Sequence, residues 1–439
     1  EGRVPASSGQ RRLWLVERLA AERTLYNVHL CVRMEGPLDP SWLRQSVAML
    51  FERHEVLRMR LHEVDGDVLG IVSPPGEVEL PLVDLRQVPP EARGQRFSQV
   101  SMDHSLTPLD LGVGPVVRMT LVALKDDEHV LLVTQHHAVT DGRSLMLLPA
   151  ELFAFYRALC DGTSPRLPTL PITYADFVVW EAQARQSPHF AAHLAWWQTR
   201  LSNLPELELP FGRKVEAPTY TGDFVTFVYP LVLTSGLESI AARHGSTLFR
   251  VLVAAWAALL HRYTGQTDFP IGTVTAMRRD PQLHGLLGYF AHTLVLRCEL
   301  EADQTFLDLV ARIDGVVREA LAHAEVPFDD IVRAVGASRR GHLNPLVQSS
   351  FVLENYSFHA HEAADQRWTP YFEEIDAGVK GGAKFDVSMA LYVTPEGLKG
   401  KLEFATDLFE RAAMERLVSH FEALLLDVVT HPARRLSDL

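Results

Sequence analysis

The chain has 439 residues, 47% of them hydrophobic, and a formal net charge of −13 at pH 7. This length exceeds what one hydrophobic core usually fills, so we expect two domains or lobes. The acidic balance, without a long run of basic residues, argues against nucleic acid or an anionic membrane surface as the main partner.

The cysteines and the apolar stretches bear on location. Cys31, Cys160 and Cys298 are far apart and show neither CxxC nor Cys/His spacing, so the sequence predicts no disulfide framework and no metal site. Apolar stretches such as residues 248–260 are too short to span a bilayer, and the first residues lack a signal-peptide pattern. We expect a cytoplasmic protein that does not enter a membrane, and the missing initiating Met indicates a piece of a longer polypeptide.

The first part of the chain predicts a mixed α/β lobe. Asn27–Met34 alternates like a strand, and Asp39-Pro40 opens a helix with apolar residues at helical spacing. A strand over 116–124, a turn over 125–128 and a returning strand from His129 predict a hairpin.

A helix is expected from Ser144 to about Leu159, followed at 161–168 by the Gly, Pro and Ser content of a linker. We place the lobe boundary there, with residues 1–165 in the N-terminal lobe and 166–439 in the C-terminal lobe.

The second part predicts another α/β lobe. Helical patterning covers 174–201, Ser235 is expected to cap a helix, an apolar helix is expected over 248–263, and a strand over 269–274. The fold class is therefore α/β in both lobes.

The stretch Gln135–Gly142 carries the strongest chemical signal. Two histidines, His136 and His137, end an apolar strand, and Asp141-Gly142 follows where a helix begins. Successive side chains at a strand end point to opposite faces, so we expect one histidine to work and the other to pack inward. Histidine titrates near neutral pH and can accept a proton from a nucleophile. The ordinary alternative is a satisfied core histidine.

Arg53–Arg58 closes the first predicted helix with four polar residues. A solvated helix end explains this pattern without any function, because cations are favoured at a helix C-terminus. The functional alternative is that Arg58 forms a bidentate pair with a buried Asp141 and so holds the loop that carries His137.

Several catalytic motifs are missing from the sequence. It contains no GxSxG elbow, no Walker A loop, no GxGxxG after a strand and no HExxH. Proton transfer between two bound substrates remains as the chemistry.

Taken together, the motifs resemble those of the condensation domains of nonribosomal peptide synthetases, over almost the whole chain. Seven segments follow the family's order: Ser7–Trp14, Arg53–Arg58, His136–Gly142, Tyr174–Trp180, Gly288–Arg297, His323–Asp329 and Asn344–Phe351. We expect Tyr174–Trp180 to serve mainly in packing.

The resemblance implies two chloramphenicol-acetyltransferase-like lobes in a V-shaped pseudo-dimer with a central tunnel. It implies that His137 is catalytic, as base or by positioning the amine, while His136, Asp141, Gly142 and Arg58 keep the loop in place. The domain would bind no cofactor or metal itself. Its substrates would arrive on the phosphopantetheine of an acceptor carrier protein and of a donor carrier protein, or as acyl-CoA. An adenylation domain would neighbour it in the same polypeptide, and we expect a monomer.

Three positions depart from the family pattern. Arg143 stands where a Trp commonly follows Asp-Gly, His292 replaces an Asn, and Val347 replaces a Phe. We expect Arg143 to line the donor side of the tunnel, with a solvent-facing helix start as the alternative.

Other functions remain open beside amide formation by an elongation domain. A starter domain would N-acylate the first amino acid from a fatty acyl-CoA, and a stand-alone acyltransferase would use coenzyme A with a soluble acceptor. An epimerisation domain would carry different C-terminal motifs. A non-catalytic recruitment platform would be expected to have degraded histidine motifs, whereas here the motif is intact.

Overall fold

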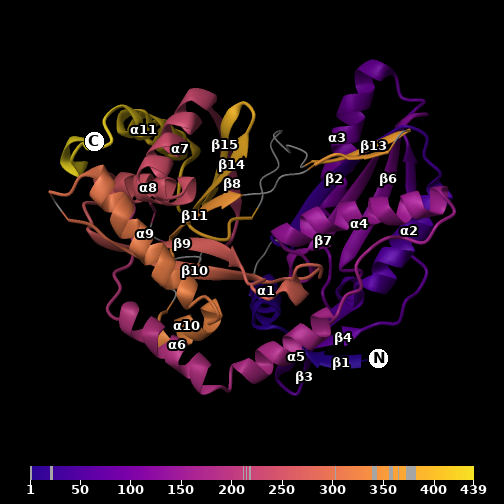
Figure 1. Cartoon of the computed structure of the whole chain (residues 1–439), viewed down its shortest axis with the longest axis horizontal. Coiled ribbons are helices and arrows are strands. Elements are labelled where there is room, and N and C mark those ends of the chain that lie inside the picture. Colours follow the sequence, from indigo (N-terminus) through magenta and orange to yellow (C-terminus); the bar gives the residue numbers. More distant parts are fainter. Residues whose placement is uncertain are drawn as a thin grey trace.

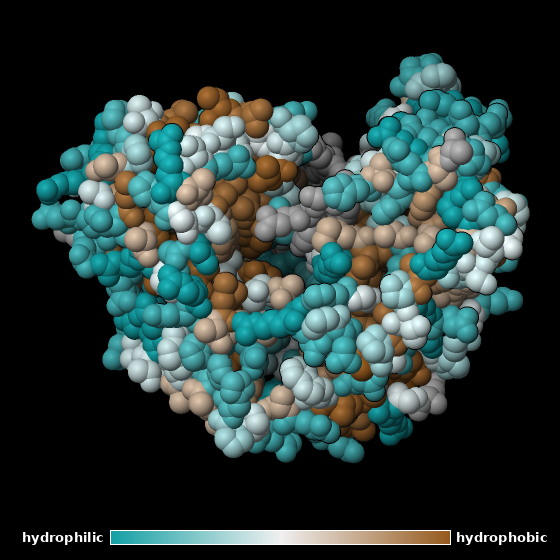
Figure 2. All heavy atoms as spheres, in the orientation of Figure 1, coloured by the Kyte–Doolittle hydropathy of each residue, from teal (hydrophilic) through white to brown (hydrophobic). Residues whose placement is uncertain are grey.

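Two α/β lobes meet at their base and spread apart like the arms of a V in the computed structural model (Figure 1). The structure describes residues 2–19, 23–210, 212–213, 215–216, 219–301, 303–338, 344–354, 359–363, 365–371 and 382–439. Each lobe is built on a six-stranded mixed sheet, as the sequence predicts for two α/β lobes. Between the lobes the surface is hollowed (Figure 2).

The sheet of the first lobe has helices on both faces. Its strands lie in the order β12 (His361–Ala363), β13 (Gln366–Tyr371), β2 (Asn27–Glu35), β7 (Glu128–His136), β6 (Val117–Lys125) and β5 (Leu82–Asp84). On one face lies α3 (Pro90–Leu106), and on the other lie α2 (Pro40–Arg53) and α4 (Gly142–Cys160). All nine residues of β7 are buried, which is why its central residues 130–133 are all apolar and do not alternate with polar ones.

Strands β12 and β13 reach this sheet from the other end of the chain. Tyr371 pairs with Cys31 and Arg367 with Glu35, so β13 lies antiparallel to β2. The boundary predicted at residue 165 places these strands in the C-terminal lobe, but they complete the N-terminal sheet. A strictly sequential division of the lobes is therefore wrong at residues 361–371.

The second lobe has its own sheet and an apolar core. Its strands lie in the order β10 (Ala291–Glu299), β9 (Asp268–Ala276), β11 (Ser349–Glu354), β14 (Val387–Thr394), β15 (Gly397–Ala405) and β8 (Gly222–Pro230). Helix α8 (Leu248–Thr264) is buried at every position from 251 to 260, and it packs among α7 (Leu231–Arg243), α9 (Phe306–Ala322) and α11 (Arg411–Thr430). An apolar helix is stable here because neighbouring elements cover all of its sides.

Shorter elements occupy the junction between the lobes. A three-stranded sheet is formed by β1 (Gly2–Pro5), β4 (Asp67–Val72) and β3 (Met59–Val64). The helices α1 (Ser8–Leu19) and α5 (Tyr174–Ala184) lie near this sheet. The helices α6 (Pro188–Arg200) and α10 (Phe328–Val335) pack against each other below the second lobe (Figure 1). The apolar core is continuous from one lobe to the other.

Two local predictions can be compared with the structure. The helical patterning over 174–201 is confirmed, and it forms two helices because Ser187 caps a new helix at Pro188. Ser235 is not a cap, since α7 already begins at Leu231 after Pro230. Within the described residues, no helix is both long and apolar enough to cross a membrane.

Candidate active site

The histidine motif lies at a strand-to-helix junction. β7 ends at His136, and one 3-10 turn, His137–Val139, precedes the start of α4 at Gly142. The backbone N–H of His137 donates to the carbonyl of Tyr26 at 2.8 Å, so the motif stays tied to the segment leading into β2. The side chain of His137 is thus presented by regular elements on both sides, as the sequence predicts.

One hydrogen bond determines which nitrogen of His137 carries the proton. Its Nδ1 lies 2.8 Å from the carbonyl oxygen of Thr140. A carbonyl oxygen only accepts, so Nδ1 must donate and Nε2 keeps its lone pair. The ring packs edge-on against Tyr289, with 5.2 Å between ring centres. His137 therefore offers a fixed hydrogen-bond acceptor.

The surroundings keep His137 neutral. Burial lowers its pKa to about 4, and the positive charge of Lys384 acts in the same direction, against weaker opposing effects of Thr140 and Asp141. Burial also lowers the pKa of Lys384, whose Nζ lies 5.5 Å from the centre of the Tyr26 ring. At neutral pH the imidazole is therefore uncharged, and its Nε2 can accept a hydrogen bond. Sequence reasoning missed Lys384, because nothing local marks it.

His136 packs into the fold. Its side chain is buried, its Nδ1 accepts from the N–H of Ala138 at 3.0 Å, and its Nε2 lies 3.4 Å from Oε2 of Glu17 on α1. This is the inward-packing partner that the strand alternation predicts. That it keeps the catalytic loop in place stays a prediction.

Asp141 is held by an arginine of the other lobe. Arg278, which follows β9, donates from Nη2 to Oδ1 at 2.8 Å and from Nε to Oδ2 at 3.2 Å. Ser144 and the N–H of Phe290 also donate to the carboxylate, which is almost fully buried. Nη1 of Arg278 donates to the carbonyls of Leu283 and Leu286, and Nη2 also donates to Oγ of Ser144. Every charge in this buried pair is thus compensated.

The prediction that Arg58 holds Asp141 is wrong. Arg58 donates to the carbonyls of Phe51 at 2.8 Å and of Ser73, and so ties α2 to the strands that follow it. The physical requirement, a cation for a buried Asp141, was predicted correctly, but Arg278 meets it. Arg278 sits four residues beyond the predicted strand 269–274, a position whose neighbours the sequence does not reveal.

The rest of the segment Arg53–Arg58 packs against neighbouring helices and is not a solvated helix end. His54 is buried, and its Nε2 lies 2.6 Å from Oε2 of Glu151 on α4, which Arg53 also binds at 3.0 Å. Glu55 accepts from the N–H of Ala175 at 3.0 Å. The segment therefore joins α2 to α4 and α5.

The segment Gly288–Phe290 and the start of α5 complete the junction. Tyr174 donates to the carbonyl of Tyr289 at 3.0 Å, and its ring packs on that of Phe290 at 5.2 Å. Gly288 has φ +152°, and a Cβ there would lie 2.3 Å from the Tyr174 ring. Only glycine permits this close approach. Tyr174 and Phe177 are buried, as the expected packing role requires, whereas Trp180 at the end of the segment is 59% exposed.

The remaining predicted positions have clear places. Gly142 is the first residue of α4, and Arg143 on the same turn is exposed. The donor-side role of Arg143 stays a prediction. His292 lies 3.1 Å from the carbonyl of Ala324 through Nδ1, and Val347 is fully buried.

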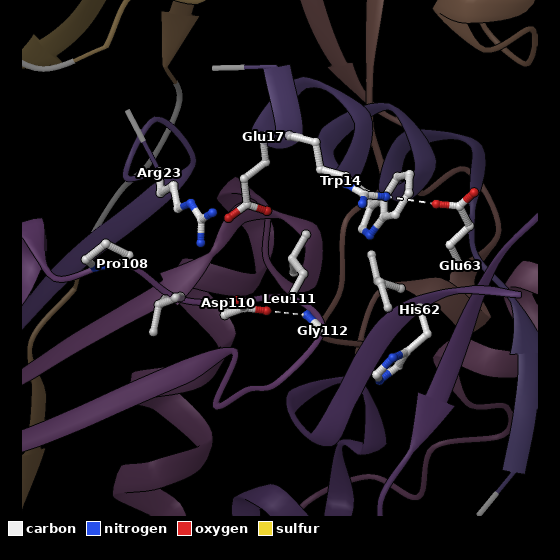
Figure 3. Close-up of a pocket in the computed structure, with 12 residues that line it drawn as sticks. Trp14, Glu17, Arg23, His62, Glu63, Pro108, Asp110, Leu111 and Gly112 are labelled. Carbon is white, nitrogen blue, oxygen red and sulfur yellow. Dashed lines mark hydrogen bonds and ion pairs between the residues drawn. The ribbon is translucent and has the colours of Figure 1, made fainter. Parts of the chain in front are cut away.

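A separate cavity of about 510 Å³ lies on the N-terminal lobe (Figure 3). Trp14 and Glu17 of α1 face its interior, together with Arg23 and the loop around Asp110. Glu17, which lines the cavity, also contacts His136. The cavity therefore lies beside the inner histidine of the motif.

The geometry defines a two-lobed α/β domain with a neutral histidine near the lobe junction. The family model for the condensation domain matches residues 1–439, and the chain belongs to this family. The resemblance to condensation domains of nonribosomal peptide synthetases is thereby confirmed.

Curated relatives are much longer than this chain. One of the proteins that make up the linear gramicidin synthase of Brevibacillus parabrevis is 34% identical over 431 residues, which cover 98% of this chain and 6% of that protein. Phosphinothricin tripeptide synthetase PhsC of Streptomyces viridochromogenes is 34% identical over 445 residues, covering 100% of this chain and 40% of the relative. The chain therefore corresponds to one part of these synthetases.

Solved structures agree on the fold. The X-domain from teicoplanin biosynthesis is 28% identical with a TM-score of 0.86, over 100% of this chain and 98% of that one. The first condensation domain of the calcium-dependent antibiotic synthetase has a TM-score of 0.82 at 22% identity, over 100% and 99% of the two chains. These neighbours confirm the expected two-lobe, chloramphenicol-acetyltransferase-like fold.

Proposed function

We propose that this domain forms an amide bond between a thioester-activated acyl or peptidyl donor and the amine of an aminoacyl thioester on an acceptor carrier protein. The observation that carries the proposal is His137, whose Nδ1 is held by Thr140 and whose Nε2 is free to accept. Membership of the condensation family supports it.

The reaction moves one proton in net, from the amine nitrogen to the departing thiolate. The amine nitrogen attacks the donor carbonyl carbon, the C–N bond forms, and the carbonyl oxygen becomes an oxyanion. Collapse of this intermediate breaks the C–S bond, and the proton lost from the amine ends on the departing thiolate. Nε2 of His137 accepts a hydrogen bond from the attacking amine and receives its proton as the nitrogen becomes positive.

The lowered pKa of His137 supports one of its two possible roles. An imidazolium with a pKa of about 4 cannot form in large amounts by deprotonating an ammonium ion before attack. The imidazolium that forms transiently during attack returns its proton readily to the leaving thiolate. This favours positioning of a neutral amine, followed by transient proton transfer. Alignment of the two thioesters supplies most of the acceleration, on the order of 7–11 kcal/mol in well-oriented cases.

The partners follow from the proposal. Both substrates are carried on phosphopantetheine arms of carrier proteins, and an adenylation domain loads the acceptor from the same polypeptide. The multidomain synthetases among the relatives support this arrangement. We place the domain in the cytoplasm as a monomer, held together with its partners by the polypeptide.

Intact-protein mass spectrometry of the acceptor carrier tests the proposal. An aminoacyl-loaded carrier is incubated with this domain and either acyl-CoA or peptidyl-carrier donors. A mass gain only from carrier donors marks an elongation domain, and a gain from acyl-CoA marks a starter domain. If a free amino acid is acylated as well as the carrier-bound one, the domain is a coenzyme A-dependent acyltransferase and the proposal is wrong.

A recruitment platform is the second candidate, and one observation favours it. The X-domain from teicoplanin biosynthesis, at 28% identity, has also been solved in complex with OxyB. The intact motif, with His137 oriented and Asp141 neutralised, argues for catalysis instead. A platform would leave the acceptor carrier's mass unchanged with every donor.

A further inference from the structure

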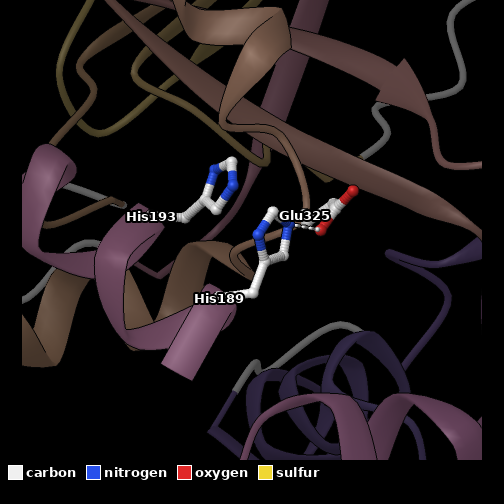
Figure 4. A group of neighbouring side chains, drawn as sticks. All are labelled: His189, His193 and Glu325. Atoms are coloured by element: carbon white, nitrogen blue, oxygen red, sulfur yellow. Dashed lines mark ion pairs between the residues drawn. The ribbon is translucent and has the colours of Figure 1, made fainter. Parts of the chain in front are cut away.

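Three metal-binding side chains meet on the second lobe, outside the site described above (Figure 4). His189 and His193 lie one helical turn apart on α6, so they project from the same face. Glu325 comes from the segment that joins α9 to α10. The cluster therefore brings together two parts of the chain that are distant in sequence.

The distances are close to those of a coordination site. Nε2 of His189 lies 3.2 Å from Oε2 of Glu325, and one ligand atom from each of the three residues lies within 4.8 Å of the others. In a tetrahedral zinc site the ligand atoms are roughly 3.4 Å apart, since each lies about 2.1 Å from the metal. The separations in the structure therefore exceed this spacing by at most about 1.4 Å.

The packing around His193 limits its movement. Its ring lies between those of His189, at 4.3 Å, and His323, at 4.6 Å. His323 in turn stacks on Trp196 with 4.0 Å between ring centres. Nδ1 of His193 is buried and has no hydrogen-bond partner among the described residues. A buried nitrogen without a partner is costly, and a bound ligand would relieve that cost.

The guanidinium of Arg279 leaves one carboxylate oxygen of Glu325 available to bind a metal ion. Nη1 of Arg279 lies 3.8 Å from Oε1 of Glu325, whereas Oε2 faces His189. Arg279 is half exposed and also donates to the carbonyl of Leu321. Arg279 therefore contacts one carboxylate oxygen of Glu325 and leaves Oε2 facing His189.

We propose that His189, His193 and Glu325 bind a divalent transition-metal ion, with water completing the coordination. Two imidazoles and one carboxylate suit Zn²⁺ and, among spectroscopic substitutes, Co²⁺. The bound ion links α6 to the segment between α9 and α10. It takes no part in amide formation, so the inference stands independently of the proposed function.

Cobalt titration of the chelator-treated full chain tests this site. We expect one Co²⁺ per chain, with visible d–d absorption that Zn²⁺ abolishes. His193→Ala and Glu325→Gln should each weaken binding by roughly tenfold or more, as is common when metal sites lose a partner. His244→Ala, which removes an exposed histidine at the end of α7, should bind Co²⁺ like the unaltered chain.

Two outcomes would overturn the proposal: no Co²⁺ absorption in the unaltered chain, or equal affinity in the cluster variants and in His244→Ala. Circular dichroism of each metal-free variant checks that it is folded. If His193→Ala does not fold, His189→Ala replaces it, because the His189 side chain is 67% exposed and its removal leaves no cavity.

Discussion

The two lobes contain similarly built hairpins, and only one of them carries the histidines. In the first lobe β6 and β7 form a hairpin, with β5 parallel to β6 on one side and β2 antiparallel to β7 on the other. In the second lobe β14 and β15 pair in the same way, with β11 parallel to β14 and β8 antiparallel to β15. A helix of 19 or 20 residues, α4 or α11, follows each hairpin.

The hairpins differ at the ends of β7 and β15. β7 ends at His136 and leads into His137, whereas β15 ends in Phe404-Ala405, both buried. Phe404 and Ala405 show that the hairpin fold needs only apolar residues at this place. Burying two imidazoles costs free energy that packing alone does not require. Packing alone therefore does not account for the polar end of β7, which supports the role proposed for His137.

The aspartates that follow the two hairpins, Asp141 and Asp407, also differ in burial and in the partners that they bind. Asp141 is buried and bound by Arg278 from the opposite lobe. Asp407 is partly exposed and accepts from the N–H and hydroxyl of Thr219 in its own lobe, at 2.6 and 2.7 Å. The first aspartate joins the lobes, and the second only fastens a loop.

Replacing Asp141 with Ala should have the largest effect on stability. It leaves the guanidinium of Arg278 buried without its counter-ion, and such losses typically cost about 3–5 kcal/mol. Urea unfolding measures the change. In a double-mutant cycle, Asp141→Ala and Arg278→Met should be strongly non-additive, whereas Asp141→Ala and Arg58→Met should add. Coupling of Asp141 to Arg58 instead would restore the original hypothesis.

Acid should destabilise the first lobe more than the second, through its buried histidines. Burial lowers the pKa of His29 to about 4 and that of His104 to about 3, and both rings bind Oγ1 of Thr134. Above pH 6.5 these histidines are neutral in both states and have no effect. Below pH 6.5 the unfolded chain takes up protons that the folded chain excludes, so the free energy of unfolding falls.

For each histidine, the free energy of unfolding falls by at most about 1.4 kcal/mol per pH unit. The fall ends near pH 3–4, where the histidines of the folded protein are also protonated. Urea unfolding at several pH values should show a shallower slope for His104→Gln than for the unaltered chain between pH 6.5 and 4. Parallel slopes would show that His104 is protonated in the folded protein.

Replacing Asp407 with Ala should have the smallest effect. Two hydrogen bonds at a partly exposed site contribute about 1 kcal/mol after competition with water. The midpoint of urea unfolding should shift slightly, and amide formation should keep its rate. A loss as large as that of Asp141→Ala would mean that the two aspartates play equal roles.

The elements around the motif were accessible from sequence because their signals are local. The apolar run before His136, the turn at 125–128 and the helix after Gly142 depend on residues within a few positions of one another. The Asp141–Arg278 pair joins residues 137 positions apart, and it exists only because the lobes pack together. Burial predicts that Asp141 needs a cation, but not which cation.

The same limit applies to the crossing strand. Strand β13 has an ordinary strand sequence, and nothing in Gln366–Tyr371 identifies β2 as its partner. Lys384 is a similar case, since its effect on His137 arises from tertiary structure. Chemistry at a strand end is readable from sequence, whereas the groups that surround it depend on the assembled lobes.

The central claim is that His137 acts on the amine, and the single-turnover rate of amide formation with His137→Ala tests it most directly. The acceptor carrier is followed by intact-protein mass spectrometry, with His62→Ala as a control in the same lobe. We predict a loss of about 10²–10⁴-fold for His137→Ala, with unchanged urea unfolding and an unchanged rate for His62→Ala. A rate for His137→Ala within a few-fold of the unaltered domain would contradict the account.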